Sequence, residues 1–544
     1  MDSSVLVRIV RIAGTWPLCA SLLAAPLHAQ TVHTFRSAVD DSDQPYAVYV
    51  PRSLEPGRRY PLVISLHAEQ STHRTNLRQV FGLPARLGTL DRDDDLRFPA
   101  AADAGYIVAC PLARGTMGYE GVAETDVYDV LADVERRYPV DRDRVYLTGI
   151  SMGGAGVLRY ALTRPDIWAA VAVIAPVVPR GIDDLAGNAL QVPVRLYHGE
   201  NDPIAKPEIS RAWHRRLLDA GTPVEYIEYP GVRHNAWDLA YRNGAMFEWF
   251  GKFRRDPFPA RVHFTTRQYR YAKAYWVTID GLTPGSAATI DARRGAQDVQ
   301  VQTTGVDGFT LTLDRPASVV TIDGATLRVK AAATLSFHRS EGMWRAGRGQ
   351  TPGKRPGAEG PMAEALVSRQ IYVYGTLGAG EEELAARRSV AADAAAWLPS
   401  RARLATNSAV KADSAVTAAD LESSDVILFG TRETNSLIAR FAASFPIQLN
   451  PGAADYGLLF IAPIGRHYAL VNSGRPWLSG GSEWEPPADS FAPLTWRILS
   501  GFGDYVLFKG SIRNVVAEGR FTNSWKVAFD SAPALLNTGT VTLH

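Results

Sequence analysis

The sequence predicts an α/β fold, followed by a small β domain and a second, C-terminal α/β domain. Between residues 31 and about 257, apolar strand-like runs alternate with segments of helical period, which is typical of a mostly parallel sheet covered by helices. From about 258 to 345 the apolar period changes to two, which predicts short antiparallel strands. Residues 362–544 return to alternating strand and helix signals. A chain of 544 residues is also too long for one hydrophobic core.

The individual elements follow from the same patterns. In the first part, β-branched and aromatic runs predict strands at 47–51, 62–66, 106–110, 144–148, 169–174, 194–198 and 224–229, with helices at 126–138 and 152–163. In the second part, strands are predicted at 275–279, 309–313 and 318–324, with turns at Asp280-Gly281 and Asp323-Gly324. In the third part, the patterns predict strands at 370–376 and 426–431 and helices at 417–421 and 436–445.

Composition places boundaries between these parts. Residues 346–361 carry five glycines and three prolines, as expected for a linker. The predicted division is therefore a signal peptide at 1–29, a mostly parallel α/β domain at 30–257, a small antiparallel β domain at 258–345, a linker at 346–361 and a C-terminal α/β accessory domain at 362–544.

The first 29 residues have the pattern of a secretory signal. Arg8 and Arg11 precede a mostly apolar stretch, and Ala29 offers a small residue for cleavage before Gln30. The alternative is an uncleaved apolar anchor, but the run is short for spanning a bilayer. The sequence thus predicts a secreted or periplasmic protein whose mature chain has no integral membrane segment and Cys110 as its only cysteine, hence no internal disulfide.

Charge and side-chain chemistry exclude several classes of function. The 58 basic and 56 acidic residues nearly balance and form no basic block, so no nucleic-acid partner is predicted. No group of Cys, His or carboxylate residues has the spacing of a metal site, so neither a metal nor another cofactor is expected. The oligomeric state is not encoded in any pattern we can interpret.

The most informative motif is G-x-S-x-G at residues 149–153, centred on Ser151. It lies between the predicted strand 144–148 and the predicted helix 152–163, so the chain makes a strand, a sharp turn and a helix. This geometry exposes a serine hydroxyl above a sheet, and Gly149 and Gly153 fit because such a turn has no room for β-carbons. Ser151 is therefore predicted to be a nucleophile.

An acid and a histidine follow Ser151 in the chain order of an α/β-hydrolase triad. His234 follows the strand 224–229 and is the predicted base, while Asp202 follows the strand 194–198 and is predicted to orient the imidazole. His198 is the rival base, although it precedes the acid in the chain. Two carboxylates, Glu200 and Asp238, compete with Asp202 for the role of the acid.

An oxyanion hole requires two backbone N–H groups directed at the developing negative charge. One is expected at Met152, directly after the nucleophile. The second is expected in the turn after the strand 62–66, from Ala68 or Glu69. Ala68 stands where glycine would be easier, which is expected to restrict the backbone there.

Together, residues 146–154, His198-Gly199-x-x-Asp202-Pro203 and Tyr229-Pro230-Gly231-x-x-His234 resemble secreted α/β-hydrolase serine esterases. That group includes polyhydroxybutyrate-depolymerase-like and feruloyl or acetylxylan esterase-like proteins and is related to prolyl-oligopeptidase-type catalytic domains. The resemblance covers residues 40–255 and implies that the domain at 30–257 is an α/β-hydrolase catalytic domain. It implies an acyl-serine mechanism. Proteins of this group usually carry His-Gly at the oxyanion turn. This chain has His67-Ala68 instead, and the difference leaves the geometry of the oxyanion hole in doubt.

Substrate choice is only weakly encoded. The segment 114–119 follows a strand end, where open sheets bind ligands, and Tyr119 and Trp237 are predicted to line an aromatic or sugar subsite. Arg114 and Glu124 are expected to form a structural pair or to be solvated. The substrate is expected to be a plant phenolic ester, an acetyl ester or a polyester, either small or polymeric.

Two other functions compete with an esterase. A prolyl-oligopeptidase-type peptidase would use the same three residues, but strand signals begin at Ala47 and leave no space for a propeller after residue 30. The other is a non-catalytic protein that binds a polymer. Trp344, Trp477, Trp484 and Trp496 could stack on sugars in that case.

The glycine-rich segment 375–380 lacks the lysine and serine or threonine of a phosphate loop.

Overall fold

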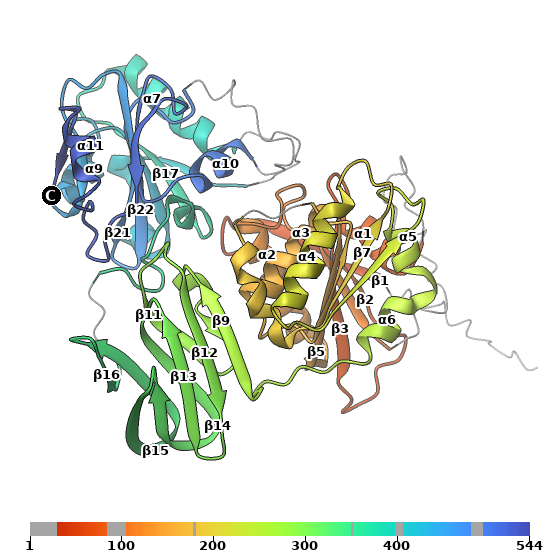
Figure 1. The fold of residues 1–544 in the computed structure, drawn as a ribbon. Helices are drawn as coiled ribbons and strands as arrows, with labels where there is room; N and C mark the ends of the chain where they lie inside the picture. The colour runs from red at the N-terminus through yellow and green to blue at the C-terminus, as the bar shows by residue number, and fades with distance from the viewer. Residues whose placement is uncertain (1–29, 84–104, 178–180, 350–352, 398–405, 480–492) are drawn as a thin grey trace, which may run out of the picture.

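The computed structural model describes residues 30–83, 105–177, 181–349, 353–397, 406–479 and 493–544. Three large sheets follow one another along this chain, and Figure 1 shows the first, with its helices, beside the other two. The predicted signal peptide and Trp484 lie outside the described residues.

The first sheet has eight strands in the order β1-β2-β4-β3-β5-β6-β7-β8. Neighbours from β4 to β8 pair in parallel, whereas β2 pairs antiparallel with β1 and β4. The strands are β1 (Gln30–Arg36), β2 (Asp43–Tyr49), β3 (Tyr60–Leu66), β4 (Ile107–Pro111), β5 (Val140–Ile150), β6 (Ala170–Ile174), β7 (Val194–Gly199) and β8 (Val224–Tyr229). The prediction of an α/β fold with a mostly parallel sheet is confirmed.

Helices cover both faces of this sheet (Figure 1). One face carries α2 (Val122–Arg137), α3 (Met152–Thr163) and α4 (Pro207–Asp219), and the other α1 (His73–Val80), α5 (Trp237–Ala240) and α6 (Ala245–Phe250). The central strands are buried along their whole length, as expected for parallel strands covered twice. Their carboxyl ends therefore meet at one edge, where loops can place side chains.

The second sheet also contains eight strands, β9 (Arg261–Thr266), β10 (Lys273–Ala274), β11 (Val277–Leu282), β12 (Ala288–Arg294), β13 (Asp298–Thr304), β14 (Val306–Ile322), β15 (Ala325–Ser340) and β16 (Met343–Ala346). Two predictions are wrong here. The predicted strands 309–313 and 318–324 form one long strand, β14, whose pairing register shifts between Thr312 and Ala317 because the proline at 316 has no N–H to donate. The pairing is also not wholly antiparallel, since β13 and β14 pair in parallel.

The predicted turn at Asp280-Gly281 is likewise wrong, because both residues belong to β11. Gly281 lies at a register shift in the pairing with β14, and a β-carbon there would be 2.7 Å from the backbone nitrogen of Gly308. The glycine therefore serves a bulge and a close approach of two strands. The predicted turn at Asp323-Gly324 does connect β14 to β15.

The third sheet has seven strands in the order β18-β17-β19-β22-β21-β23-β24. The pairs from β18 to β22 are parallel and the remaining pairs are antiparallel. The strands are β17 (Gln370–Tyr374), β18 (Ala409–Ala412), β19 (Asp425–Phe429), β21 (Tyr456–Ile464), β22 (His467–Gly474), β23 (Tyr505–Lys509) and β24 (Val515–Gly519), while β20 (Ile447–Leu449) pairs with β25 (Val541–Leu543). The helices are α7 (Glu381–Ala395), α8 (Ala418–Ser423), α9 (Ser436–Phe441), α10 (Leu494–Ser500) and α11 (Ala532–Leu536).

A buried apolar cluster joins the first and third sheets through the face that carries α2 and α3. Polar bonds add to it: the Trp496 indole donates to Glu120 at 3.4 Å, and the Thr125 hydroxyl donates to the Val367 carbonyl at 3.2 Å. Trp344, Trp477 and Trp496 are all less than 10% exposed. These three side chains therefore pack in the core or between domains, the more common role of tryptophan, and are not available for stacking on sugars.

Gly153 allows α3 to approach the end of β3. A β-carbon at this position would be 2.2 Å from the Leu66 carbonyl oxygen and 2.8 Å from that of His67, far inside van der Waals contact. A β-carbon at Gly149 would be 2.5 Å from the Gly153 carbonyl oxygen. The predicted reason for both glycines, a turn without room for β-carbons, is confirmed.

Gly153→Ala is therefore expected to destabilise the fold by about 1–3 kcal/mol or more, because α3 and β3 must separate. Chemical denaturation of the variant measures this loss. Gly380→Ala is a matched control, since a β-carbon at Gly380 meets nothing within 4 Å. Equal stability of the two variants would contradict the packing argument.

Candidate active site

Ser151 lies between β5 and α3 in a conformation that L-residues rarely adopt. Its φ is 55° and its ψ is −115°, and its N–H donates to the Ile174 carbonyl of β6 at 2.9 Å. Such strained residues persist only where the surrounding structure holds them, and they gather at functional sites. The turn places the hydroxyl at the carboxyl edge of the sheet, where the chain after β7 and β8 can reach it.

His234 lies in the loop that follows β8, and its ring joins Ser151 to Asp202. Nε2 is 2.9 Å from Ser151 Oγ, and Nδ1 is 2.7 Å from Asp202 Oδ2. With Nδ1 protonated and donating to the carboxylate, Nε2 accepts from the serine hydroxyl. The side chain of His234 is 19% exposed, so the ring is open to solvent on one side.

Asp202 is held by the backbone of its own loop. Its Oδ1 accepts from the N–H groups of Ile204 at 2.8 Å and Ala205 at 3.0 Å, which leaves Oδ2 directed at His234. The end of β7 contacts the loop after β8 directly. A β-carbon at Gly199 would lie only 2.1 Å from the Arg233 carbonyl oxygen, so glycine is needed for this close approach. The structure thus brings the three predicted residues, Ser151, His234 and Asp202, into one hydrogen-bonded chain.

His198, the rival base, is fully buried and does not face Ser151. Its Nδ1 is 2.7 Å from the Ser210 hydroxyl, and its Nε2 is 2.8 Å from the Ala205 carbonyl and 3.2 Å from Asp202 Oδ2. Burial lowers the pKa of His198, so this ring is neutral at physiological pH. The ring packs against the Asp202 carboxylate, a contact that no sequence pattern predicted.

The two competing carboxylates make other contacts. Glu200 accepts from the Gly231 N–H at 2.9 Å, and Asp238 accepts from the Asn235 amide at 2.7 Å. Both residues are exposed, and neither bonds to His234. Of the three acids considered, only Asp202 therefore orients the imidazole.

The oxyanion turn, residues 67–70, follows β3 and lies against the start of α3, directly after Ser151. Met152 is the first residue of α3, so its N–H has no intrahelical acceptor. Within the turn region, Gln70 N–H donates to Thr116 Oγ1 at 3.1 Å and Ser71 N–H donates to the Ala68 carbonyl at 3.2 Å. Those two N–H groups are engaged, and Ala68 and Glu69 stay the predicted second donors.

The backbone at Ala68 does not adopt a conformation that needs glycine. The left-handed residue of this turn is Gln70, with a φ of 57°, and Ala68 is not among the residues with positive φ in the described chain. A β-carbon at position 68 therefore costs no backbone strain, which removes the objection raised by the missing glycine.

The two predicted subsite aromatics differ in accessibility. Tyr119 is 1% exposed, and its hydroxyl donates to the His67 carbonyl at 3.1 Å, so its assignment to a substrate subsite is wrong. Burial raises the pKa of Tyr119, which keeps the hydroxyl protonated as a donor. Trp237 is half-buried, and its ring meets that of His234 edge-on at 5.3 Å, so it stays a candidate for contact with substrate.

Arg114 and Glu124 do not pair with each other. Arg114 bonds to Asp40 at 2.6 Å and to Asp126 at 2.7 Å, whereas Glu124 accepts from the Tyr271 hydroxyl at 2.6 Å. Both side chains are also buried, so the expectation of a structural pair or of solvated side chains is wrong, although their contacts are structural. No sequence signal connected positions 40 and 114, because they meet only through the fold.

No group of three or more His, Cys, Asp or Glu side chains suited to a metal ion occurs in the part of the chain described here. The same described segments contain no helix that is both long and apolar enough to cross a membrane. Cys110 is a free, buried thiol whose pKa is raised by burial.

The sheet order, the strained serine between strand and helix, and the chain of hydrogen bonds from Ser151 to Asp202 define an α/β-hydrolase of the serine hydrolase class. Residues 37–217 match the family model described as "Esterase: Putative esterase". For that part of the chain, the predicted resemblance to serine esterases is confirmed.

The chain is similar to several known proteins over part of its length. A cutinase of Thermobifida alba (Cutinase est2) is 29% identical over 119 residues, which cover 22% of this chain and 38% of that protein. A thermostable esterase is 23% identical with a TM-score of 0.35, covering 42% of this chain and 64% of its own. A ferulic acid esterase of Anaeromyces mucronatus is 19% identical with a TM-score of 0.31, covering 40% and 91%.

Proposed function

We propose that this protein is a secreted serine hydrolase that cleaves carboxylic esters through an acyl-serine intermediate. The observation that carries the proposal is the continuous hydrogen bonding from Asp202 through His234 to Ser151 at a strained turn. The esterase family match over residues 37–217 supports ester hydrolysis in particular. The location rests on the basic, apolar and small-residue pattern of residues 1–29.

The geometry suggests a role for each group. Ser151 Oγ attacks the ester carbonyl while His234 Nε2 takes its proton, and Asp202 stabilises the imidazolium. The N–H of Met152 and that of Ala68 or Glu69 stabilise the oxyanion. His234 then protonates the leaving alcohol, and a water activated by the same histidine releases the acid from Ser151.

The half-buried ring of Trp237 lies 5.3 Å from that of His234, and we propose that it contacts the substrate, a phenolic ester, an acetyl ester or a polyester. The β sheet of residues 261–346 and the C-terminal sheet are proposed to be accessory domains, the second of α/β type. Neither of these two sheets carries any of the three catalytic side chains.

A substrate panel tests the function. Purified protein and Ser151→Ala are assayed with p-nitrophenyl acetate and butyrate, methyl ferulate, acetylated xylan, and alanyl and prolyl p-nitroanilides. Ester turnover that disappears with Ser151 supports the esterase, and the best substrate identifies the acyl group. Faster Ser151-dependent turnover of the anilides would favour a peptidase, and no turnover at all would favour a binding role.

A further inference from the structure

The loop after β4, residues 112–121, is strained over much of its length; we refer to it as the support loop. Ala113, Arg114 and Gly115 have φ values of 45°, 59° and 75° in succession, and Tyr119 has a φ of 60°. A left-handed residue other than glycine costs roughly 1–2 kcal/mol, so consecutive ones persist only if other contacts impose them.

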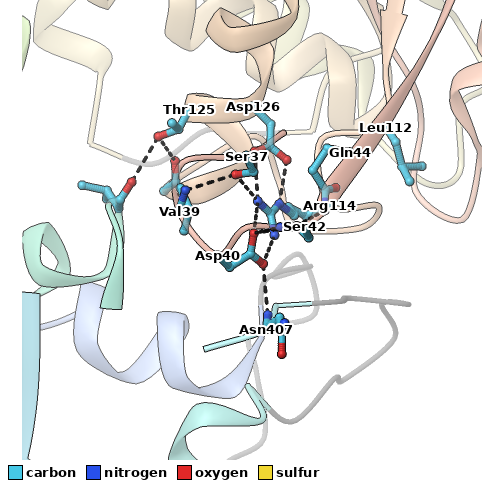
Figure 2. A network of polar contacts seen from close by, with 12 residues as sticks. Ser37, Val39, Asp40, Ser42, Gln44, Leu112, Arg114, Thr125, Asp126 and Asn407 are labelled. Atoms are coloured by element: carbon cyan, nitrogen blue, oxygen red, sulfur yellow. Dashed lines mark hydrogen bonds and ion pairs between the residues drawn. The ribbon is translucent and has the colours of Figure 1, made fainter. Parts of the chain in front are cut away.

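Those contacts come from the fully buried side chain of Arg114, whose hydrogen bonds and ion pairs are drawn in Figure 2. Its guanidinium donates to Asp40 Oδ2 at 2.6 Å, to Asp126 Oδ2 at 2.7 Å and to the Ser37 hydroxyl at 2.7 Å. Asp40 also accepts from the Asn407 N–H at 3.0 Å, which joins the network to the C-terminal part. A buried guanidinium needs this complete pairing, and its planar fork holds the acceptors in one geometry.

The support loop in turn holds the oxyanion turn. Thr116 Oγ1 accepts from Gln70 N–H at 3.1 Å, and the Tyr119 hydroxyl donates to the His67 carbonyl at 3.1 Å. The ring of His67 also lies 2.9 Å from the Leu112 carbonyl. Three contacts therefore join residues 112–119 to both ends of a turn that is predicted to supply an oxyanion donor.

We infer that Arg114 is a positioning residue for the oxyanion turn: its buried carboxylate network imposes the strained support loop, and that loop holds residues 67–70. The inference rests on the proposed function for its catalytic consequence, although the structural linkage can be measured without turnover. Arg114 itself touches no reacting group. It acts on the place where the oxyanion forms, so its loss should affect kcat more than KM.

Arg114→Lys tests the inference, because lysine keeps the positive charge between Asp40 and Asp126 but cannot form the forked bonds. Amide hydrogen exchange of a peptide covering residues 67–72 is expected to accelerate at least several-fold. On the best ester substrate, kcat is expected to fall roughly 10- to 100-fold, since small misplacement of a donor is costly, with KM changed less than about 3-fold. Arg255→Lys, at an arginine paired with Asp143 away from the support loop, is the matched control and should change neither readout.

Two further variants cut the link without disturbing a buried charge. Thr116→Val and Tyr119→Phe each remove one bond to the oxyanion turn, and both should accelerate exchange there and lower kcat. If Arg114→Lys fails to fold, Ser37→Ala, which removes one acceptor of the Arg114 guanidinium, should produce the same two effects and decides the role of Arg114. Wild-type exchange and wild-type kcat in all the folded variants would overturn the inference. An inactive wild-type enzyme would count against the proposed function alone, because exchange at residues 67–72 would still decide the role of Arg114.

Discussion

Ser151→Ala is expected to lower kcat for ester hydrolysis by about 10⁶-fold, because the attacking oxygen is lost. The fold should be retained. Alanine has the same backbone cost as serine at a φ of 55°, and the substitution removes the side-chain hydrogen bond to His234, so the free energy of unfolding should change by about 0.5 kcal/mol or less. Steady-state kinetics with a p-nitrophenyl ester, together with thermal unfolding, measure both effects.

A fluorophosphonate probe provides an independent check of the same residue. It should label the wild-type protein once, at the peptide that contains Ser151, and should not label Ser151→Ala. Turnover in the alanine variant equal to that of the wild type would disprove the nucleophile assignment. Labelling at another serine would move the reactive site elsewhere in the chain.

Asp202→Asn is expected to lower kcat by about 10⁴-fold while KM changes little. The asparagine carbonyl can keep the acceptor position of Oδ1 towards the N–H groups of Ile204 and Ala205, so the loop should keep its shape. Its NH₂ group would then face His234 Nδ1, and a donor there selects the tautomer that cannot accept the serine proton on Nε2. Steady-state kinetics with the same ester measure the loss.

The competing acid provides the control for this prediction. Asp238→Asn changes an exposed carboxylate that bonds to Asn235 and should leave kcat unaltered. A large loss in Asp238→Asn with a small loss in Asp202→Asn would reverse the assignment of the acid.

Much of the first sheet could be predicted because the local signals agreed with the tertiary fold. The helix 152–163 has the predicted bounds, since its helical period coincides with burial. The strand 224–229 also has the predicted bounds, but it lies at the edge of the sheet and is only half-buried, so the prediction of a buried strand there is wrong. Prediction failed at β14, where two separate strands were expected at 309–313 and 318–324. The chain instead continues through an irregular pairing, and only partner strands can determine that.

The sequence by itself determined the order of nucleophile, acid and histidine and the strand or turn on which each lies, because glycines, apolar periods and chain order are local properties. Only the tertiary structure decided that Asp202 rather than Glu200 or Asp238 meets the imidazole. It also decided that Tyr119 supports the oxyanion turn instead of lining a subsite, and that Arg114 lies between Asp40 and Asp126. These outcomes depend on which loops meet at the carboxyl edge of the sheet, and such long-range contacts leave no periodic trace in the chain.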